Sequence, residues 1–143
     1  MNRRLHQQGF SLIELVVVMG IAAILTMIAV PSYQASVIKG RRAEARVVIN
    51  DTAQRLERCY TQFGAYDALD GGGAALCPIV DDEEIDSQGG FYTLTVDIPD
   101  ATTYTLTAEP QGVQEDDEKC GTLSQTNTGV RAITGTDDVE YCW

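Results

Sequence analysis

Histidine is almost absent from the sequence, since the only one is His6, close to the N-terminus. Nucleophiles of the Ser-His and Cys-His kinds need an imidazole, so these arrangements are excluded from the rest of the chain. HExxH, P-loop and GxGxxG motifs are also missing. Acidic residues are plentiful, but the sequence predicts no cleft that would pair them for acid-base catalysis. We therefore expect a protein that is not an enzyme and that needs no cofactor.

Basic residues are scarce in the second part of the chain. From residue 59 onward, only Lys119 and Arg131 stand against seventeen Asp and Glu residues, and the whole chain has a formal net charge of -11. Such an excess of negative charge repels phosphate groups. The sequence therefore predicts no direct nucleic-acid binding.

The cysteines include no CxxC pair, which argues against a zinc site. The four of them are Cys59, Cys77, Cys120 and Cys142. Their even number suits two disulfides in an oxidising compartment, for which three connectivities are possible. Pairing Cys59 with Cys77 and Cys120 with Cys142 joins sequence neighbours, and each closed loop would stabilise a small domain by about 3 kcal/mol. We expect this pairing and no bound metal.

Two acidic runs, at residues 81–86 and 115–118, offer the oxygen ligands that calcium prefers. Neither run has the ligand spacing of an EF-hand loop. We interpret both as solvated acidic loops rather than as calcium sites.

Residues 15–30 form an uncharged apolar run of sixteen positions, and adding residues 10–13 gives about the twenty residues that span a bilayer. The segment before this run is short and polar, and it carries Arg3 and Arg4. By the positive-inside rule, these two arginines hold that segment in the cytoplasm. The run therefore predicts a membrane helix, with all the cysteines on the outer side.

An ordinary secretory signal has its cleavage site after the apolar run, whereas here Gly9 followed by Phe10 stands before it. Glu14 lies inside the apolar segment, where a carboxylate costs on the order of 2.5 kcal/mol, and that segment holds no Lys or Arg to pair with it. Cleavage after Gly9 would create an α-amino group one helical turn before Glu14, or on a neighbouring subunit at the same depth. The alternative is a signal anchor that is never cut.

The segment GFSLIELVVVMGIAAILTMIAVPSYQ resembles the class III signal of type IV prepilins and of type II secretion pseudopilins. It joins a basic leader ending in glycine, an aromatic first mature residue, a glutamate at the fifth mature position, a long apolar helix and a proline followed by Ser-Tyr. The resemblance implies that a prepilin peptidase and methyltransferase cuts after Gly9 and N-methylates Phe10, and that Glu14 guides assembly. Other pilin subunits, an inner-membrane assembly platform and, before assembly, inner-membrane lipid are the further partners that it implies.

The distal chain resembles minor pilins of the PilE type from the type IVa pilus. The similar segments are RRAEARVVINDTAQRLERCY, TYTLTAEP, and KCGTL with the closing YCW. The pair Cys59 and Cys77 and the acidic runs depart from that pattern. The resemblance implies a type IV pilin fold and favours a minor subunit.

The hydrophobic pattern predicts an α+β fold with one long helix and a small antiparallel sheet. The helix should run from about residue 11 to 62, bend at Pro31 and end at Gly64 as a C-terminal cap. Its second half is amphipathic, and the face expected to pack on the sheet consists of Ala45, Ile49, Ala53, Leu56, Tyr60 and Phe63. Two hairpins, residues 91–98 with 103–109 and residues 120–126 with 130–134, supply the sheet.

These elements divide the chain into three predicted parts. They are a leader at residues 1–9, a transmembrane and assembly helix at 10–31, and an extracytoplasmic globular domain at 32–143. The globular domain comprises the amphipathic helix 32–63, a connecting loop 64–90, and the sheet with its C-terminal disulfide loop, 91–143.

A basic cluster follows the apolar run and consists of Lys39, Arg41, Arg42 and Arg46. Two interpretations remain open. The cluster contacts lipid headgroups or the acidic residues of a neighbouring subunit, or it lies on a solvated helix face with local ion pairs to Glu44.

Together these features predict a structural subunit, a minor pilin, which begins as a single-pass inner-membrane precursor and ends in a pilus at the cell surface. It would support pilus biogenesis, twitching, adhesion or DNA uptake. A type II secretion pseudopilin and a membrane-anchored extracytoplasmic binding module that never polymerises are the alternatives. Glu14 favours a polymer, because an anchored module gains nothing from a carboxylate at lipid depth.

We expect the membrane-extracted protein to begin at N-methylated Phe10 when the host's prepilin peptidase is present, and at Met1 when the peptidase is absent. Intact-mass and peptide mass spectrometry distinguish the two forms. A start at Met1 in both samples would identify an uncleaved anchor and contradict prepilin processing.

Overall fold

The computed structural model describes residues 11–69 and 71–143, and the chain divides into two compact units at Val37 and Ile38. Helix α1 (Leu12–Phe63) runs through both units. It forms the helix described in the first unit, and its second half is the first element of the second unit. The predicted helix of residues 11–62 is therefore confirmed to within one residue at each end. The predicted cleavage residues Gly9 and Phe10 lie outside the described residues.

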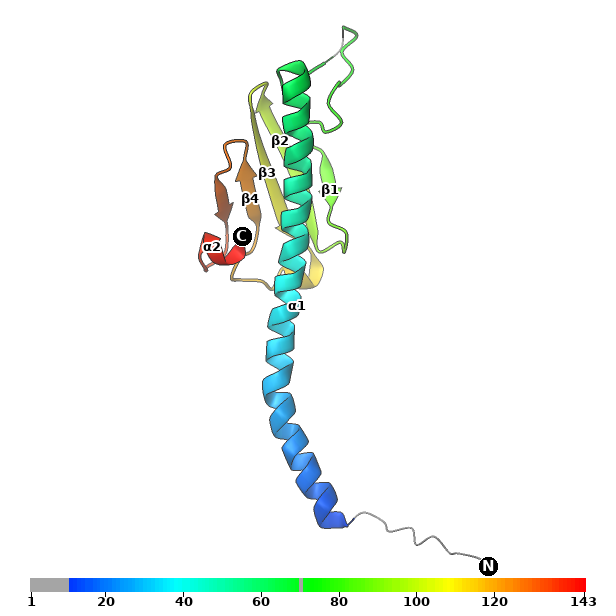
Figure 1. The fold of residues 1–143 in the computed structure, drawn as a ribbon, viewed down its shortest axis with the longest axis vertical. Helices are drawn as coiled ribbons and strands as arrows, with labels where there is room; N and C mark the ends of the chain where they lie inside the picture. The colour runs from blue at the N-terminus through cyan, green and yellow to red at the C-terminus, as the bar shows by residue number, and fades with distance from the viewer. Residues whose placement is uncertain (1–10, 70) are drawn as a thin grey trace, which may run out of the picture. The chain divides into compact units, whose positions relative to one another are not determined.

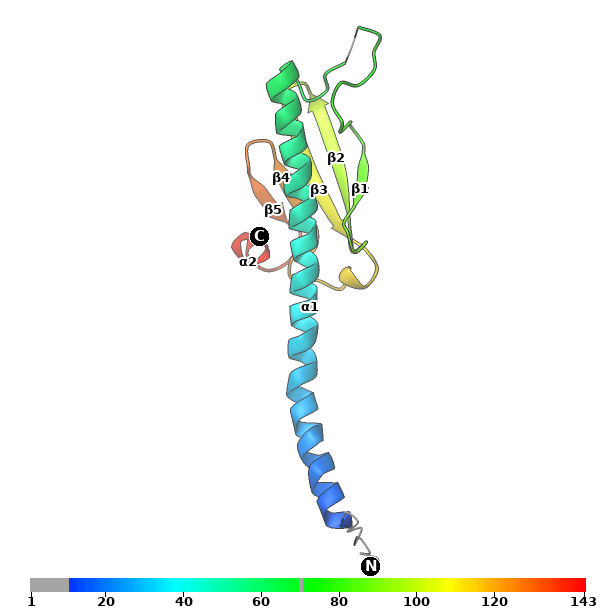
Figure 2. The same cartoon turned by 45° about the vertical axis from the view of Figure 1, so that its right-hand side comes forward.

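The second unit is a five-stranded antiparallel sheet packed against α1, as Figures 1 and 2 show. The strands follow the chain in the order β1 (Glu84–Asp86), β2 (Tyr92–Asp100), β3 (Thr103–Pro110), β4 (Leu123–Thr126) and β5 (Arg131–Ile133). The short elements η1 (Gly112–Gln114) and α2 (Val139–Cys142) follow β3 and β5. The expected α+β fold and both expected hairpins are confirmed.

The core lies between one face of the sheet and one stripe of α1. Along β2 and β3, buried and less buried residues alternate, as the two-residue period of a strand requires. Leu94, Val96 and Leu106 are fully covered, and they join Ile49 and Leu56 of the helix in one apolar cluster. This cluster is the main source of stability, because each large apolar side chain that it buries contributes about 1.5–3 kcal/mol.

The predicted helix face is wrong at its C-terminal end. Tyr60 and Phe63 were expected in the core, but they are 37% and 46% exposed. The apolar cluster includes no helix residue beyond Leu56, because the last turns of α1 are covered by other parts of the chain rather than by the sheet. One of these covers is the disulfide from Cys59 to Cys77, and another is Tyr66.

The connecting loop predicted for residues 64–90 is wrong in one respect, because it contains strand β1. This strand pairs Glu84, Ile85 and Asp86 with residues 93–95 of β2. Only Ile85 is partly buried, so the strand has no run of apolar alternation that a sequence pattern would reveal. A short, charged strand is typical of a sheet edge that must not pair with another chain.

The helix ends as predicted at Gly64, which has a φ of 76° and donates its N–H to the carbonyl of Tyr60 at 2.8 Å. Just before this end, Glu57 Oε1 accepts hydrogen bonds from the phenols of Tyr66 at 2.9 Å and Tyr104 at 3.2 Å. Burial, together with the Glu57 carboxylate, raises the pKa of Tyr66 to about 12. The start of the long loop is thus held to both the helix and the sheet.

Candidate functional site

Two places in the molecule hold a carboxylate in apolar surroundings, one in each unit. The first is Glu14, which lies in the first turn of α1. From Ser11 to Ser36 every described residue is exposed in the single chain, and this part of α1 is long and apolar enough to cross a membrane. No ion pair to Glu14 is present among the residues that the structure describes.

Pro31 lies inside α1, and the helix continues through it. Proline removes one backbone donor and crowds the preceding turn, so a bend at this position remains a prediction.

The second place is a buried ion pair between α1 and the segment that precedes β4. Arg42 Nε and Nη2 donate to the two carboxylate oxygens of Asp117, each at 2.6 Å. The side chains are only 5% and 2% exposed. Two parallel charge-assisted bonds of this kind give a fixed geometry as well as attraction. They raise the pKa of Arg42 against the opposing effect of burial.

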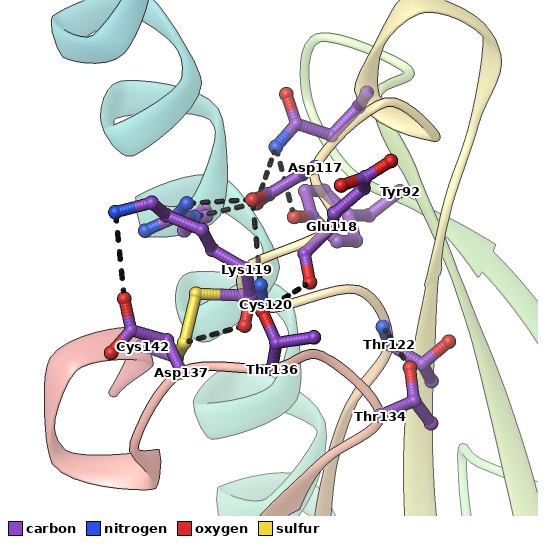
Figure 3. A network of polar contacts seen from close by, with 12 residues as sticks. Tyr92, Asp117, Glu118, Lys119, Cys120, Thr122, Thr134, Thr136, Asp137 and Cys142 are labelled. Carbon is purple, nitrogen blue, oxygen red and sulfur yellow. Dashed lines mark hydrogen bonds and ion pairs between the residues drawn. A yellow bond between two sulfur atoms is a disulfide. The ribbon is translucent and has the colours of Figure 1, made fainter.

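Asp117 is the centre of a wider network, drawn in Figure 3. It also accepts from Gln114 Nε2 at 3.2 Å and from the backbone N–H of Cys120 at 3.4 Å. Gln114 Nε2 in turn donates to the Tyr92 hydroxyl at 3.1 Å, and burial raises the pKa of that phenol. One carboxylate therefore joins the helix, strand β2 and the start of the C-terminal disulfide loop.

The C-terminal loop is fastened at this same point. The disulfide joins Cys120 to Cys142 of α2, and Lys119 Nζ lies 3.6 Å from Asp137 Oδ2. Gly135 passes so close to the backbone at Lys119 that an added Cβ would overlap it. Figure 3 shows the disulfide beside Asp117. The loop after β5 thus packs directly on the segment that holds the buried carboxylate.

The interpretation of residues 115–118 as a solvated acidic loop is wrong for Asp117, which is 4% exposed. Its neighbours Glu115, Asp116 and Glu118 are exposed, as expected. Asp117 differs from them because it has a cation to pair with inside the protein. Within the described part of the chain, no group of His, Cys, Asp and Glu lies together as a metal site would require.

The interpretation of the basic cluster as a solvated helix face with ion pairs to Glu44 is wrong for Arg42 and Arg46, whereas contact with lipid or with a neighbouring subunit remains a prediction. Arg42 is buried, and Arg46 Nη1 donates to the carbonyl of Trp143 at 2.7 Å. Arg41 lies over the ring of Phe91 at 4.1 Å from its centroid. Glu44 accepts from the backbone N–H of Gly89 at 2.8 Å and pairs with no basic residue of the described chain. These three arginines hold the helix to the segment before β2, to the segment before β4 and to the C-terminal residue.

Sequence analysis missed the buried pair, although a signal for it exists. Arg42 precedes Ala45 and Ile49 by three and seven residues, so it lies on the same helix stripe as the core. A cation on an apolar stripe needs a buried anion. Nothing local identifies Asp117 as that anion, because it stands 75 residues away among other acids.

Comparison with known families gives two matches. The family model described as "Type IV minor pilin ComP, DNA uptake sequence receptor" matches residues 31–124, about two thirds of the 143 residues. The model of the prokaryotic N-terminal methylation motif matches residues 4–30. The second match covers both predicted cleavage residues and Glu14.

Comparison with individual proteins also gives matches. The prepilin peptidase-dependent protein D of Escherichia coli (strain K12) is 39% identical over 66 residues, which are 46% of this chain and 45% of the relative. Two solved structures are similar, each with a TM-score of 0.49. A type IV pilin from Shewanella oneidensis is 30% identical and covers 74% of this chain and 97% of its own. The non-core minor pilin PilV of Neisseria meningitidis is 22% identical, with 72% and 92% covered.

We predict that replacing Arg42 by Met lowers the free energy of unfolding by about 3–5 kcal/mol, because it leaves Asp117 buried without a cation. Adding Asp117→Asn should recover part of this loss, since a neutral amide costs less to bury. Urea denaturation of the full chain in detergent, followed by near-UV circular dichroism, measures both. The matched control is Arg55→Met, which removes the exposed pair with Asp51 and should cost no more than about 1 kcal/mol. An equal loss in the two single variants would contradict a structural role for the buried pair.

Proposed function

The chain belongs to the type IV minor pilin family of ComP, and from this membership we propose that it is a structural pilus subunit which assembles through the first turns of α1. It is anchored in the inner membrane as a precursor and ends in a pilus at the cell surface. Its partners are a prepilin peptidase, which cuts after Gly9 and methylates Phe10, and other pilins. An inner-membrane assembly platform and membrane lipid complete the proposed set. We propose no catalytic role.

The observation that carries the proposal is the position of Glu14. This carboxylate lies in an apolar helix segment that nothing in the single chain covers, and it has no described ion-pair partner there. In lipid, such a group is costly until it meets a cation. The α-amino group that cleavage exposes at Phe10 is a cation at a similar depth. Each incoming subunit can therefore offer the charge that an assembled neighbour needs.

This pairing explains why one carboxylate can direct assembly. Apolar side chains give only weak guidance here, because lipid tails are as apolar as they are and leave no hydrophobic driving force between helices. A buried pair of opposite charges is favourable only when the two groups meet. Glu14 would therefore select one register for each new subunit, whereas the apolar residues supply contact area.

The alternatives differ in what they require of Glu14. An anchored binding module needs a spanning helix but no carboxylate within it. A type II secretion pseudopilin would use Glu14 in the same way as a pilin, but the family match is to minor pilins. The pilin assignment is therefore the function that we propose.

We predict that Glu14→Ala leaves membrane insertion and cleavage unchanged and removes the subunit from sheared filaments. Glu14→Asp should keep part of the incorporation, because the charge is retained on a shorter side chain. Immunoblots of membrane and sheared-pilus fractions measure the distribution, and Thr26→Ala serves as a control in the same exposed helix segment. Normal incorporation of the Glu14→Ala variant into filaments would contradict the proposed role of Glu14 in assembly.

The family description also names a receptor for DNA uptake sequences, and this activity does not fit the charges of the present chain. Beyond residue 58, its basic residues are Lys119 and Arg131. Arg55 and Arg58 are also exposed, at the end of α1, and Arg55 is paired with Asp51. Lys119 lies beside Asp137, and Arg131 stacks over the ring of Trp143 at 4.7 Å. Binding to DNA is driven largely by the neutralisation of phosphates. We therefore propose that this subunit supports the filament without contacting DNA itself.

We predict that the full chain in detergent binds neither duplex nor single-stranded DNA more tightly than about 10⁻⁴ M at low salt, the weak end of non-specific binding. Fluorescence anisotropy with labelled oligonucleotides measures this affinity. The charge-reversed variant Asp116→Lys with Glu118→Lys should bind more tightly, and less so as salt rises, which shows that the assay responds to surface charge. Salt-dependent binding by the unaltered chain at about 10⁻⁶ M would establish a DNA-binding role.

A further inference from the structure

A groove lies between α1 and strand β1 in the second unit, with a volume of about 520 Å³. The apolar part of its lining consists of Ala43, Val47 and Val48 from the helix and Ile85 from the strand. Val47 is 67% exposed, which is unusual for an aliphatic side chain flanked by other apolar groups. The groove therefore offers apolar area that the single chain does not bury.

The rim of this groove is acidic. Glu44, Asp51 and Asp86 border it, and no Lys or Arg of the described chain does. Glu44 and Asp86 accept hydrogen bonds from a backbone N–H and from the Thr93 hydroxyl, neither of which carries charge. Only Asp51 has a cationic neighbour, Arg55, at 2.8 Å. An occupant that brought an apolar side chain with a basic residue beside it would match this surface.

The chain itself carries such a surface at the C-terminal end of α1. Arg55, Arg58, Phe63 and Leu76 surround a smaller hollow of about 190 Å³, and we call them the helix-end patch. Phe63 is 46% and Leu76 is 41% exposed. Arg58 makes no ion pair with any residue that the structure describes. This patch is apolar and basic, so it is the chemical complement of the groove.

The two surfaces share one ridge of α1. Glu44, Val47, Asp51, Arg55 and Arg58 follow each other at steps of three and four residues, which keeps them on one side of a helix. The ridge is acidic toward its N-terminal end and basic toward its C-terminal end. Two parallel copies placed side by side in register would bring acid against acid and arginine against arginine. Two copies displaced along the helix axis bring opposite charges together.

We propose that the groove of one copy receives the helix-end patch of a second, axially displaced copy. The contact uses different surfaces on the two partners, so it is head-to-tail and can propagate instead of closing on a pair. This inference rests on the proposed filament function and adds to it a specific contact between globular units. Phe63 and Leu76 supply apolar contact for Val47, and Arg58 meets the carboxylates of the rim.

Cysteine crosslinking tests this contact in the full chain. Two differently tagged copies are co-expressed in pilus-producing cells, one with Val47→Cys and one with Phe63→Cys, and treated with a short bis-maleimide. We expect a product carrying both tags from this pairing. Val47→Cys in both copies, or Phe63→Cys in both, should yield only background. Val130→Cys paired with Val47→Cys is the matched control, because Val130 is 63% exposed but lies outside both surfaces.

A charge exchange tests whether the occupant is a second copy. Asp86→Lys in the copy with the groove cysteine should lower the crosslink about fivefold, the change expected from the stronger exposed ion pairs. Arg58→Glu in the other copy should restore it. Glu109→Lys, at an exposed acid outside the groove, should leave the yield unchanged. Loss of the crosslink without restoration would assign the groove to a different protein and overturn the proposal.

Membranes and sheared filaments are both probed for the tags before crosslinking. This step distinguishes a failure of the proposed contact from a failure of the proposed pilin function. Absence of the chain from the filaments would contradict the pilin function, and the contact is then judged from the membrane fraction. Presence in the filaments with equal crosslink yields from all cysteine pairs would overturn the head-to-tail contact alone.

Discussion

The ion pair between Arg42 and Asp117 fixes how α1 is aligned on the rest of the globular unit, whereas the apolar cluster supplies most of the stability. An isolated charge cannot remain buried, so the helix residue and the loop residue must reach the same place for either to be tolerated. Hydrophobic packing alone would accept several alignments of α1 on the sheet. The bidentate pair is compatible with one alignment of the helix. The disulfide of Cys120 then fixes the C-terminal loop beside this pair. Together with the bond from Arg46 to the carbonyl of Trp143, this pair joins the second half of α1 to the C-terminal loop.

Patterns that repeat within a few residues predicted most of this fold. The apolar run, the stripe of Ala45 and Ile49, and the alternating strands β2 and β3 are local signals, and each appears in the structure where it was expected. Prediction failed where the outcome depended on distant partners. Asp117 could not be told from its acidic neighbours, because its cation stands 75 residues away. Strand β1 has too few residues for a pattern, and Tyr60 lies beyond the part of the helix that the sheet covers.

The two proposals share one principle, since in both units charge would select a register that apolar contact leaves open. At lipid depth the proposed selecting group is Glu14, with the mature N-terminus as its proposed partner. On the globular unit it is the ridge that changes from Glu44 and Asp51 to Arg55 and Arg58. Both devices disfavour parallel copies in register and favour displaced ones. A filament needs this preference, because subunits that stop in register can form only a flat cluster in the membrane.

Membership in a family described by a DNA receptor does not determine what this chain contacts. A pilin scaffold consists of the apolar helix, the sheet and the disulfide loop, and these elements form whatever the sign of the surface charge. Contact with DNA does depend on the sign of the surface charge, because each phosphate that is not neutralised lowers the affinity. Beyond residue 58, seventeen acids stand against Lys119 and Arg131, both of which lie beside internal partners, so we propose that the surface formed by this part of the chain does not bind phosphate. Its acids instead suit a basic protein surface, and the helix-end patch of the chain is one.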